Sequence, residues 1–298
     1  MKHYKAFGFR ISSEFPISQL TADCTAEAAD ITIRRADLSH LKLAHERMRF
    51  LEDGIALCYS DAGTFCVRNG DLILVDPEQS CTESVLGIFL MGSCMGAILH
   101  QRGAMPLHGS CITDGKRSIL LTGDSGAGKS TLAAEFLRRG WKLITDDVSA
   151  LYDIDGVPVV QASYPSQKLW QDALDRYERP EEDVHSLYVS DEREKFGVDV
   201  SRFFFDGRAP LSMVVRLVPH AASCQLLPLE GMTKVDQLMR NTYRATMIEK
   251  RNAQRHFQRC VTLSTKIPMA VVTRADGEDC AGRMYDLITE LLEEKQHD

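Results

Sequence analysis

Nine consecutive residues near the middle of the chain, Gly123–Thr131, constrain its fold more than any other segment. An apolar run typical of a strand, Ser118–Thr122, precedes them, and an amphipathic pattern typical of a helix, Ser130–Arg139, follows. The pattern G-x-x-x-x-G-K-[ST] is complete in Gly123, Asp124, Ser125, Gly126, Ala127, Gly128, Lys129 and Ser130. Glycines let a backbone turn its N–H groups inward around an anion. The segment therefore predicts a strand, a loop that binds nucleotide phosphates, and a helix.

The residues that close this loop carry side chains suited to a triphosphate and its metal. Lys129 is a compact cation that can reach the β- and γ-phosphates. The hydroxyl of Ser130 is a ligand for Mg²⁺, which keeps water and phosphate oxygens as its other ligands. The positive end of the helix dipole adds to the attraction for phosphate. We predict ATP and Mg²⁺ as cofactors, with Thr131 as the last residue of the binding segment.

Two adjacent carboxylates, Asp146 and Asp147, follow the next apolar run, Trp141–Thr145. A short helix followed at once by a strand returns the chain beside the loop, and neighbouring parallel strands end at the same edge of a sheet, where ligands bind. We expect both acids to lie near the phosphates and Mg²⁺. An ordinary acidic turn after a strand is the alternative, because Asp is common there.

The run from His108-Gly109 through the loop to Asp146-Asp147 resembles the catalytic domain of HPr kinase/phosphorylase. Phosphoenolpyruvate carboxykinases share the loop and the acid pair more distantly. The resemblance is strong over residues 105–150. It implies that Lys129 and Ser130 hold the triphosphate and Mg²⁺, that Asp146 is the general base for a serine hydroxyl, and that Asp147 binds Mg²⁺ or assists. It leaves open which acid does which, and implies that His108 orients or tunes one of them.

Elsewhere the chain resembles the HPr-kinase-like proteins that modify lasso-peptide precursors, on the segments Phe7–Ile11, His100–Gly103 and Lys168–Leu174. That likeness implies that the acceptor is the C-terminal serine of a ribosomally made precursor peptide. The chain departs from HPr kinases at Thr131, where they usually carry Glu. It also lacks their later Glu-x-Arg-Gly-x-Gly signature, to which Val214–Leu217 is the nearest match.

The pattern of apolar and turn residues divides the chain into three parts. Residues 1–79 read as a β-rich N-terminal region, residues 80–104 as a linking buried helix centred on Val85–Leu99, and residues 105–298 as the ATP-binding catalytic domain. Asn69-Gly70 is the strongest short hairpin signal in the first part, and Leu107–Ile112 reads as a strand at the start of the third. The predicted fold class is α/β (α+β overall), a phosphate-loop kinase core of the HPr kinase and phosphoenolpyruvate carboxykinase type. Residues 163–208 read as polar and irregular, a substrate loop or a solvated insertion, and 236–260 as one long helix.

Basic side chains outside the loop offer weaker signals. Arg251, Arg255 and Arg259 fall on one stripe of the helix expected over 236–260, which is typical of a solvated face or of a surface for an acidic peptide or phosphates. Lys168 and Lys195 stand in the irregular region and either reach the substrate or the γ-phosphate or are simply exposed. We carry Lys168, Lys195, Arg251 and Arg255 forward as candidate substrate residues.

Composition narrows the functional classes. The formal net charge of −7 argues against a general nucleic-acid binder. Nine cysteines without a C-x-x-C pair indicate reduced thiols in a cytoplasmic protein. The N-terminus has no apolar signal core, and the longest apolar stretch, Val85–Leu99, is shorter than a membrane-spanning helix requires. We therefore expect no membrane partner and no nucleic acid, and the sequence is compatible with a homo-oligomer.

The predicted activity is that of an ATP-dependent serine kinase whose partner is a peptide or small protein. Two alternatives use the same loop. One is a binding module that senses ATP and hydrolyses it slowly or not at all. The other is a small-molecule kinase or a carboxykinase-like enzyme. Loss of ATP that depends on an acceptor distinguishes the kinase from the sensor, and phosphate on peptides but not on metabolites distinguishes it from the third class.

Overall fold

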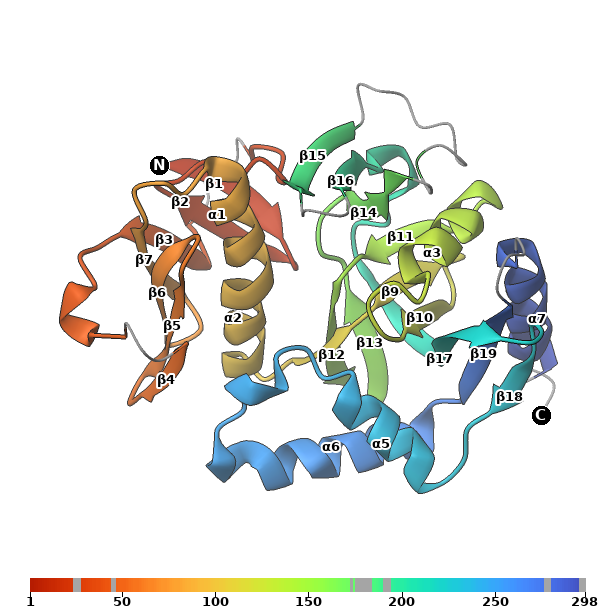
Figure 1. Cartoon of the computed structure of the whole chain (residues 1–298). Coiled ribbons are helices and arrows are strands. Elements are labelled where there is room, and N and C mark those ends of the chain that lie inside the picture. Colours follow the sequence, from red (N-terminus) through yellow and green to blue (C-terminus); the bar gives the residue numbers. More distant parts are fainter. Residues whose placement is uncertain are drawn as a thin grey trace.

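The structure is a computed structural model that describes residues 1–23, 28–43, 47–171, 174, 184–189, 194–275 and 280–294. It is a mixed α/β fold in which two large sheets flank a buried helix (Figure 1). The N-terminal sheet has seven strands in the order β1-β2-β3-β7-β6-β5-β4. Their bounds are β1 Lys2–Ala6, β2 Phe9–Ser13, β3 Ile31–Arg35, β4 Met48–Leu51, β5 Gly54–Tyr59, β6 Gly63–Arg68 and β7 Leu72–Pro77.

The tight turn between β6 and β7 confirms the strongest hairpin signal of this region. Asn69 and Gly70 both have a positive φ, at 52° and 73°, as a two-residue turn that matches the twist of its strands requires. Strand β4 stands at one end of the sheet and pairs with β5 alone among the described strands.

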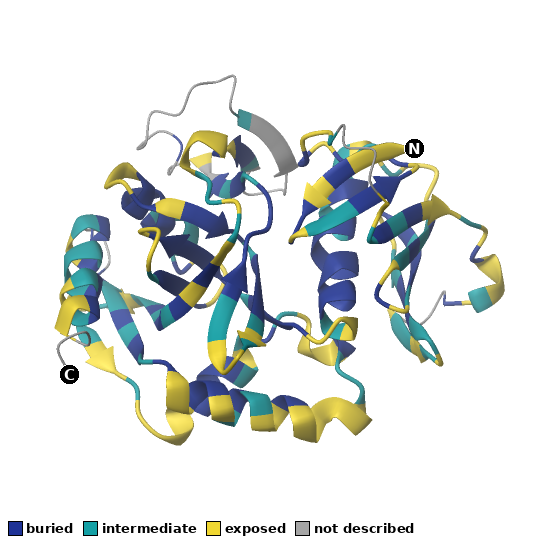
Figure 2. Cartoon of the chain, turned by 180° about the vertical axis from the view of Figure 1, so that it is seen from behind, coloured by how far each residue is buried: buried dark blue, intermediate teal, exposed yellow. Residues whose placement is uncertain are grey.

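The linking helix runs from Glu83 to Gln101, within the residues 80–104 that the sequence pattern indicated. It comprises α1 Glu83–Phe89, a π-helical turn at Leu90–Cys94 and α2 Met95–Gln101. Thr82 caps its start by accepting a hydrogen bond from Val85 N. Within the described residues it is the one helix long and apolar enough to span a membrane, but 67% of its apolar window is buried inside the protein. Figures 1 and 2 show it packed between the two sheets, as a core helix is.

The second sheet has nine strands and contains the phosphate loop. Its main path runs β11-β9-β10-β17-β13-β12-β8, with β19 beside β17 and β18 beside β19. The bounds are β8 Met105–His108, β9 Ser110–Thr113, β10 Ser118–Thr122, β11 Lys142–Thr145, β12 Val148–Ile154, β13 Val157–Gln161, β17 Arg208–Ala221, β18 Leu226–Pro228 and β19 Met269–Ala275.

Two sequence-based expectations about this sheet are wrong. The strand expected over 107–112 is interrupted at Gly109, so that β8 pairs with β12 while β9 pairs with β10 and β11. A side chain at Gly109 would run into the backbone oxygen of Leu121, which explains the glycine there. Strands β10 and β11 are also not neighbours, because β9 lies antiparallel between them.

Helices cover both faces of this sheet. On one face α3 Lys129–Arg138 and α7 Ala281–Glu294 pack on Ile119, Leu121 and Val215. On the other, α5 Met232–Arg240 and α6 Ala253–Lys266 pack on Leu120 and Val214. Successive side chains of β10 and β17 therefore pack into separate hydrophobic cores on the two faces of the sheet, because both faces of these strands are buried.

The single helix expected over 236–260 is broken between α5 and α6. Asn241 O accepts a hydrogen bond from His108 N, and Tyr243 N donates to Pro106 O, so this stretch pairs with the end of β8. Arg244 takes a left-handed φ of 50°. Bonds to β8 therefore replace the helical bonds that the apolar periodicity alone had predicted.

The stretch expected to be irregular contains a small sheet. Strands β14 Ser166–Trp170, β15 Val184–Val189 and β16 Glu194–Asp199 pair antiparallel in the order β14-β16-β15. The N-terminal region contacts the start of this part: Phe7 N donates to Ser163 O at 3.0 Å, and the rings of Phe7 and Tyr164 meet edge to face.

Candidate active site

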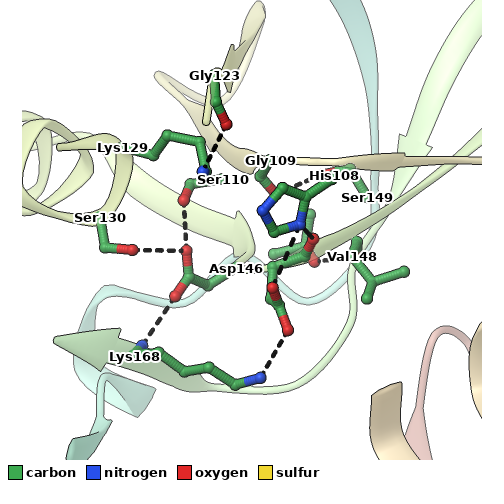
Figure 3. Close-up of polar contacts among 12 residues, drawn as sticks. His108, Gly109, Ser110, Gly123, Lys129, Ser130, Asp146, Val148, Ser149 and Lys168 are labelled. Atoms are coloured by element: carbon green, nitrogen blue, oxygen red, sulfur yellow. Dashed lines mark hydrogen bonds and ion pairs between the residues drawn. The ribbon is translucent and has the colours of Figure 1, made fainter. Parts of the chain in front are cut away.

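The phosphate loop has the predicted local structure. Gly123, Gly126 and Gly128 all adopt positive φ values, from 82° to 137°, which only glycine takes without strain. Gly123 has no room for a side chain, because a Cβ there would lie 2.6 Å from Leu217 O. Residues 124–126 are exposed, so the loop is open to a ligand. The ammonium group of Lys129 donates to Gly123 O at 2.8 Å and to Asp124 O at 3.1 Å, at the mouth of the loop (Figure 3).

Asp146 lies against the first turn of α3. Its Oδ1 accepts hydrogen bonds from the hydroxyls of Ser110 and Ser130, the latter at 3.4 Å, and its Oδ2 accepts one from Lys168 N at 2.8 Å (Figure 3). The side chain is buried, with 6% of the residue exposed. The hydroxyl that the motif assigns to Mg²⁺ and a carboxylate oxygen thus face the same small volume.

Asp147 contacts a lysine and a histidine. Its Oδ2 accepts from Lys168 Nζ at 2.6 Å, and its Oδ1 lies 3.3 Å from His108 Nδ1. The same ring nitrogen lies 3.0 Å from Asp147 O. The residue has a positive φ of 74°, unusual for a residue other than glycine, and such backbone strain is concentrated at functional sites.

The switch in strand pairing at Gly109 explains why the two acids diverge. Strand β11 pairs with β9, which brings the end of β11 and Asp146 beside Ser110. Strand β12 pairs with β8, with Val148 opposite His108, which brings Asp147 beside His108. The adjacent acids therefore sit on the two sides of the point where one set of paired strands gives way to the other.

Burial and the nearby Asp147 together determine whether Lys168 and His108 are charged. Burial lowers the pKa of Lys168, but the Asp147 carboxylate together with Tyr164 and Tyr243 outweighs burial and holds the pKa well above its usual range. Burial lowers the pKa of His108 below its ordinary value, and the attraction of Asp147 only partly offsets this effect. At neutral pH the site therefore contains a charged Lys168 and a neutral His108 beside Asp147.

Several residues of the site were not singled out from the sequence. Ser110 follows His108-Gly109 directly, at the start of β9, so its position two residues after the histidine was a usable signal. Gln167 donates to Ser130 O at 3.0 Å, and its buried Oε1 has no partner among the described residues. Tyr243 stacks on His108 with ring centroids 6.1 Å apart, and Arg274 reaches to within 3.1 Å of where a Cβ on Gly128 would stand. The last two come from distant segments that no local pattern connects to the loop.

The structure places the four candidate substrate residues in different parts of the molecule. Lys168 is in the site, but on Asp147 rather than free to meet a substrate. The side chain of Lys195 lies outside the described residues, and only its backbone in β16 is placed. Arg251 and Arg255 line a separate cavity between β4, α2 and α6, and the described lining of that cavity includes no residue of the phosphate loop.

The donor set of the site fits Mg²⁺ in number and chemistry. Ser130 and Asp146 supply adjacent hard oxygen ligands, and Mg²⁺ typically takes only one or two such protein groups alongside water and phosphate oxygens. Among the described residues there is no group of three or more His, Cys, Asp and Glu side chains that could cage a metal, and Mg²⁺ with a nucleotide does not need one.

Comparison with known proteins supports the same segment. Residues 102–171 match the family model of the HPr Serine kinase C-terminal domain. An HPr kinase/phosphorylase of Clostridium beijerinckii is 48% identical over 50 residues, which is 17% of each chain. One of Lacticaseibacillus casei is 41% identical over 59 residues, 20% of this chain and 18% of the relative. The matches thus cover less than a fifth of these relatives' length.

A solved structure of the Hpr(Ser) kinase/phosphatase from Coxiella burnetii is 13% identical, with a TM-score of 0.35, over 64% of this chain and 93% of the other. The family match covers the stretch that contains the loop, both acids, His108 and Lys168. In that stretch, residues 102–171, this chain is similar to the C-terminal domain of HPr serine kinases.

Proposed function

We propose that this protein is an ATP-dependent kinase that transfers the γ-phosphoryl group to a serine hydroxyl of a peptide or small protein in the cytoplasm. One observation carries the proposal: two adjacent carboxylates flank the first turn of the phosphate-loop helix and face different partners. Asp146 shares a volume with Ser130, and Asp147 meets His108 and Lys168. A site that only held a nucleotide would have no evident use for the second acid.

The geometry favours an assignment of the acids opposite to the one that the sequence resemblance implied. Asp146 is the acid beside Ser130, so we assign it to the metal. Asp147 is the acid held by neutral His108 and by Lys168, so we assign it to the serine hydroxyl as general base. Positive φ at Asp147 turns its side chain out of the strand direction and toward these partners.

Transfer then needs positioning and charge neutralisation more than covalent help from the protein. The serine oxygen forms a bond to the γ-phosphorus, the bond from that phosphorus to the β,γ-bridging oxygen breaks, ADP leaves, and the hydroxyl proton moves to Asp147. Lys129 and the amides of the loop offset the charge on the phosphates. When bound at Ser130 and Asp146, Mg²⁺ supplies further neutralisation of the β- and γ-phosphate oxygens.

The names of the matched relatives refer to HPr, a protein substrate, which supports a polypeptide acceptor for this chain as well. Within that class, we propose the C-terminal serine of a lasso-precursor peptide as the acceptor. The support for this narrower choice is the likeness of residues 7–11, 100–103 and 168–174 to lasso-precursor kinases.

The test incubates the purified full chain with ATP, MgCl₂ and two peptide sets, one with a terminal serine and one with an internal serine, and follows phosphorylation by mass spectrometry. We expect phosphoserine on the peptides, with Asp147→Asn lowering kcat by about 10²–10⁴-fold at an unchanged Mg²⁺ requirement. Asp146→Asn is expected to raise the Mg²⁺ concentration needed for half-maximal rate.

Three results would contradict the proposal. ATP loss that is independent of any acceptor would indicate a slow hydrolase or sensor. Phosphate on small metabolites but not on peptides would indicate a small-molecule kinase. A raised Mg²⁺ requirement in Asp147→Asn, with none in Asp146→Asn, would overturn the division of roles between the acids.

A further inference from the structure

A second cavity lies outside the phosphate-loop site, with a volume of about 450 Å³. Three parts of the chain that are far apart in sequence line it: β4 with the turn to β5, the C-terminal end of α2, and the segment from Met247 to Arg259 that leads into α6. Figure 1 shows these elements meeting below the linking helix. The volume is in the range of ligand-binding cavities in proteins.

Glu52, Asp53 and Glu249 line this cavity together with three arginines, but the α6 side carries two arginines that no carboxylate pairs with among the described residues. Arg251 is paired with Glu249, but neither Arg255 nor Arg259 forms an ion pair with a carboxylate among the residues that the structure describes. Burial lowers the pKa of Arg259, and the like charge of Arg255 lowers it further. Two guanidinium groups held together without a counter-ion favour an anion between or beside them.

Two histidines that line the same cavity have lowered pKa values, in part because of the positive charge of Arg259. Burial lowers the pKa of His100, and Arg259 lowers it further. Burial, His100 and Arg259 together lower the pKa of His256 to about 4. The nearby Glu52 and Asp53 line the opposite side, on the β4–β5 turn, and Asp53 pairs with Arg68. The α6 side of the cavity therefore presents an excess of positive charge, which Asp153 offsets only in part at Arg259.

The opposite wall of the cavity includes strand β4, which is an edge strand of the N-terminal sheet. Strand β4 is the last strand of its sheet, and its outer edge pairs with no other strand in the described ranges. Phe50, in the middle of β4, lines the cavity with 37% of its surface exposed. An unpaired strand edge is a place where an extended peptide can add by main-chain hydrogen bonds, and pockets beside it then select side chains.

The cavity is connected to the active site by a short stretch of chain. His100 Nε2 lies 2.9 Å from Tyr243 O, and the ring of Tyr243 stacks on His108, which contacts Asp147. Met247, which lines the cavity, is four residues beyond Tyr243. The two sites are therefore joined through Tyr243, which contacts a residue of each.

We propose that this cavity binds an acidic stretch of the peptide acceptor, in extended form along β4 with its carboxylates on Arg255 and Arg259, while its serine is at Asp147. This inference rests on the proposed function for the role of the peptide. The charge complementarity and the open strand edge select an acidic polypeptide rather than a small anion, which would use the arginines but have no use for β4.

The test measures binding without ATP, so that it is independent of phosphoryl transfer. The probe is a fluorescein-labelled oligo-glutamate peptide, followed by polarisation on the full chain, with oligo-glutamine and inorganic phosphate as competitors. The double variant Arg255→Gln/Arg259→Gln removes the two arginines, and Arg202→Gln removes an exposed arginine outside the cavity. Thermal melting checks that all variants are folded.

We expect salt-sensitive binding that the double variant weakens by about tenfold or more and Arg202→Gln leaves unchanged. Competition by phosphate at the same concentration as oligo-glutamate would assign the cavity to small anions and overturn the proposal. Equal binding by wild type and the double variant, or no binding by wild type, would overturn it as well.

A second measurement separates this inference from the proposed function. On serine peptides with and without an acidic stretch, the double variant is expected to raise KM for the acidic peptide about tenfold at unchanged kcat and to leave the neutral peptide unaffected. If peptides bind in this way but are never phosphorylated, the proposed function fails and the binding site stands. If peptides are phosphorylated with the same KM in both proteins, the docking site fails and the kinase stands.

Discussion

The two proposed anion sites, the phosphate loop and the arginine-lined cavity, are built in different ways. In the loop the groups are contiguous: backbone amides, glycines, Lys129 and Ser130 all come from nine residues. In the cavity they come from β4, α2 and α6, separated by up to two hundred residues. The loop can thus be predicted from the sequence, and the conformation of its own backbone places its groups. The cavity exists only because the N-terminal sheet packs near α6.

The largest expected effect on either site is at Lys129 of the loop. Its ammonium group donates to two loop carbonyls at the surface end of the loop, so we expect its replacement to leave the core packing intact. We expect Lys129→Ala to lower phosphoryl transfer by about 10³-fold or more while the midpoint of thermal unfolding stays near that of wild type. Transfer assays and differential scanning fluorimetry measure the two effects. Transfer near the wild-type rate would show that the loop acts through its backbone alone.

The connection between the two anion sites is tested at Gly96. A Cβ at this position would lie 2.8 Å from the ring of Tyr243, the residue that stacks on His108 and bonds to His100. Gly96→Val is expected to cost about 3 kcal/mol in the free energy of unfolding, because the ring cannot move aside in a packed interior, and to slow transfer. Chemical denaturation measures the cost.

The matched control for Gly96→Val is the same change in a Tyr243→Leu background, where the ring is absent. There the destabilisation is expected to shrink to about 1 kcal/mol. A cost that is the same in both backgrounds would mean that Tyr243 is not the obstacle, and that Gly96 is needed for the helix itself.

The cavity side can be probed by pH at His256, whose Nε2 lies 2.9 Å from Thr242 Oγ1. Its folded pKa of about 4 is below the ordinary value of about 6.5, so between these values the unfolded chain binds more protons. Stability is therefore full above about pH 6.5 and falls as the pH drops toward 4. Compared with His256→Gln, wild type should lose about 2 kcal/mol more between pH 7 and pH 5 in denaturant titrations.

Parallel pH curves for wild type and His256→Gln would contradict a neutral, buried His256. A smaller difference in the presence of the oligo-glutamate peptide would sharpen the comparison instead, because a bound acid would raise the pKa of His256 toward its ordinary value.

The smallest expected effect is at Ser110, the buried hydroxyl that donates to Asp146. Removing one of the donors to that carboxylate leaves Lys168 N and Ser130 in place. Ser110→Ala should lower kcat about tenfold, with a raised Mg²⁺ requirement, because Asp146 is held less firmly. The rate as a function of MgCl₂ concentration reports this directly. Ser149→Ala, which removes a hydroxyl bonded to Gly109 O rather than to an acid, is the control, and an equal effect there would indicate a general loss of packing.

The sequence determined the chemistry that lies in short contiguous runs. Strand β10, the glycine turn and helix α3 formed as predicted, because the pattern of apolar residues and glycines acts over one or two turns of chain. Of the two acids expected near the loop, Asp146 contacts Ser130 in its helix. The hairpin at Asn69-Gly70 was equally local.

Only the tertiary structure determined which residues from distant segments come into contact. The break at Gly109, the break of the helix at 241–252 and the insertion of β9 between β10 and β11 all depend on hydrogen bonds between segments distant in sequence. Those bonds send Asp146 to Ser130 and Asp147 to His108, and they bring the arginines of α6 to β4. Periodicity reports which face of an element is buried, but not which neighbour it meets, since that choice is made by pairing and packing across the whole fold.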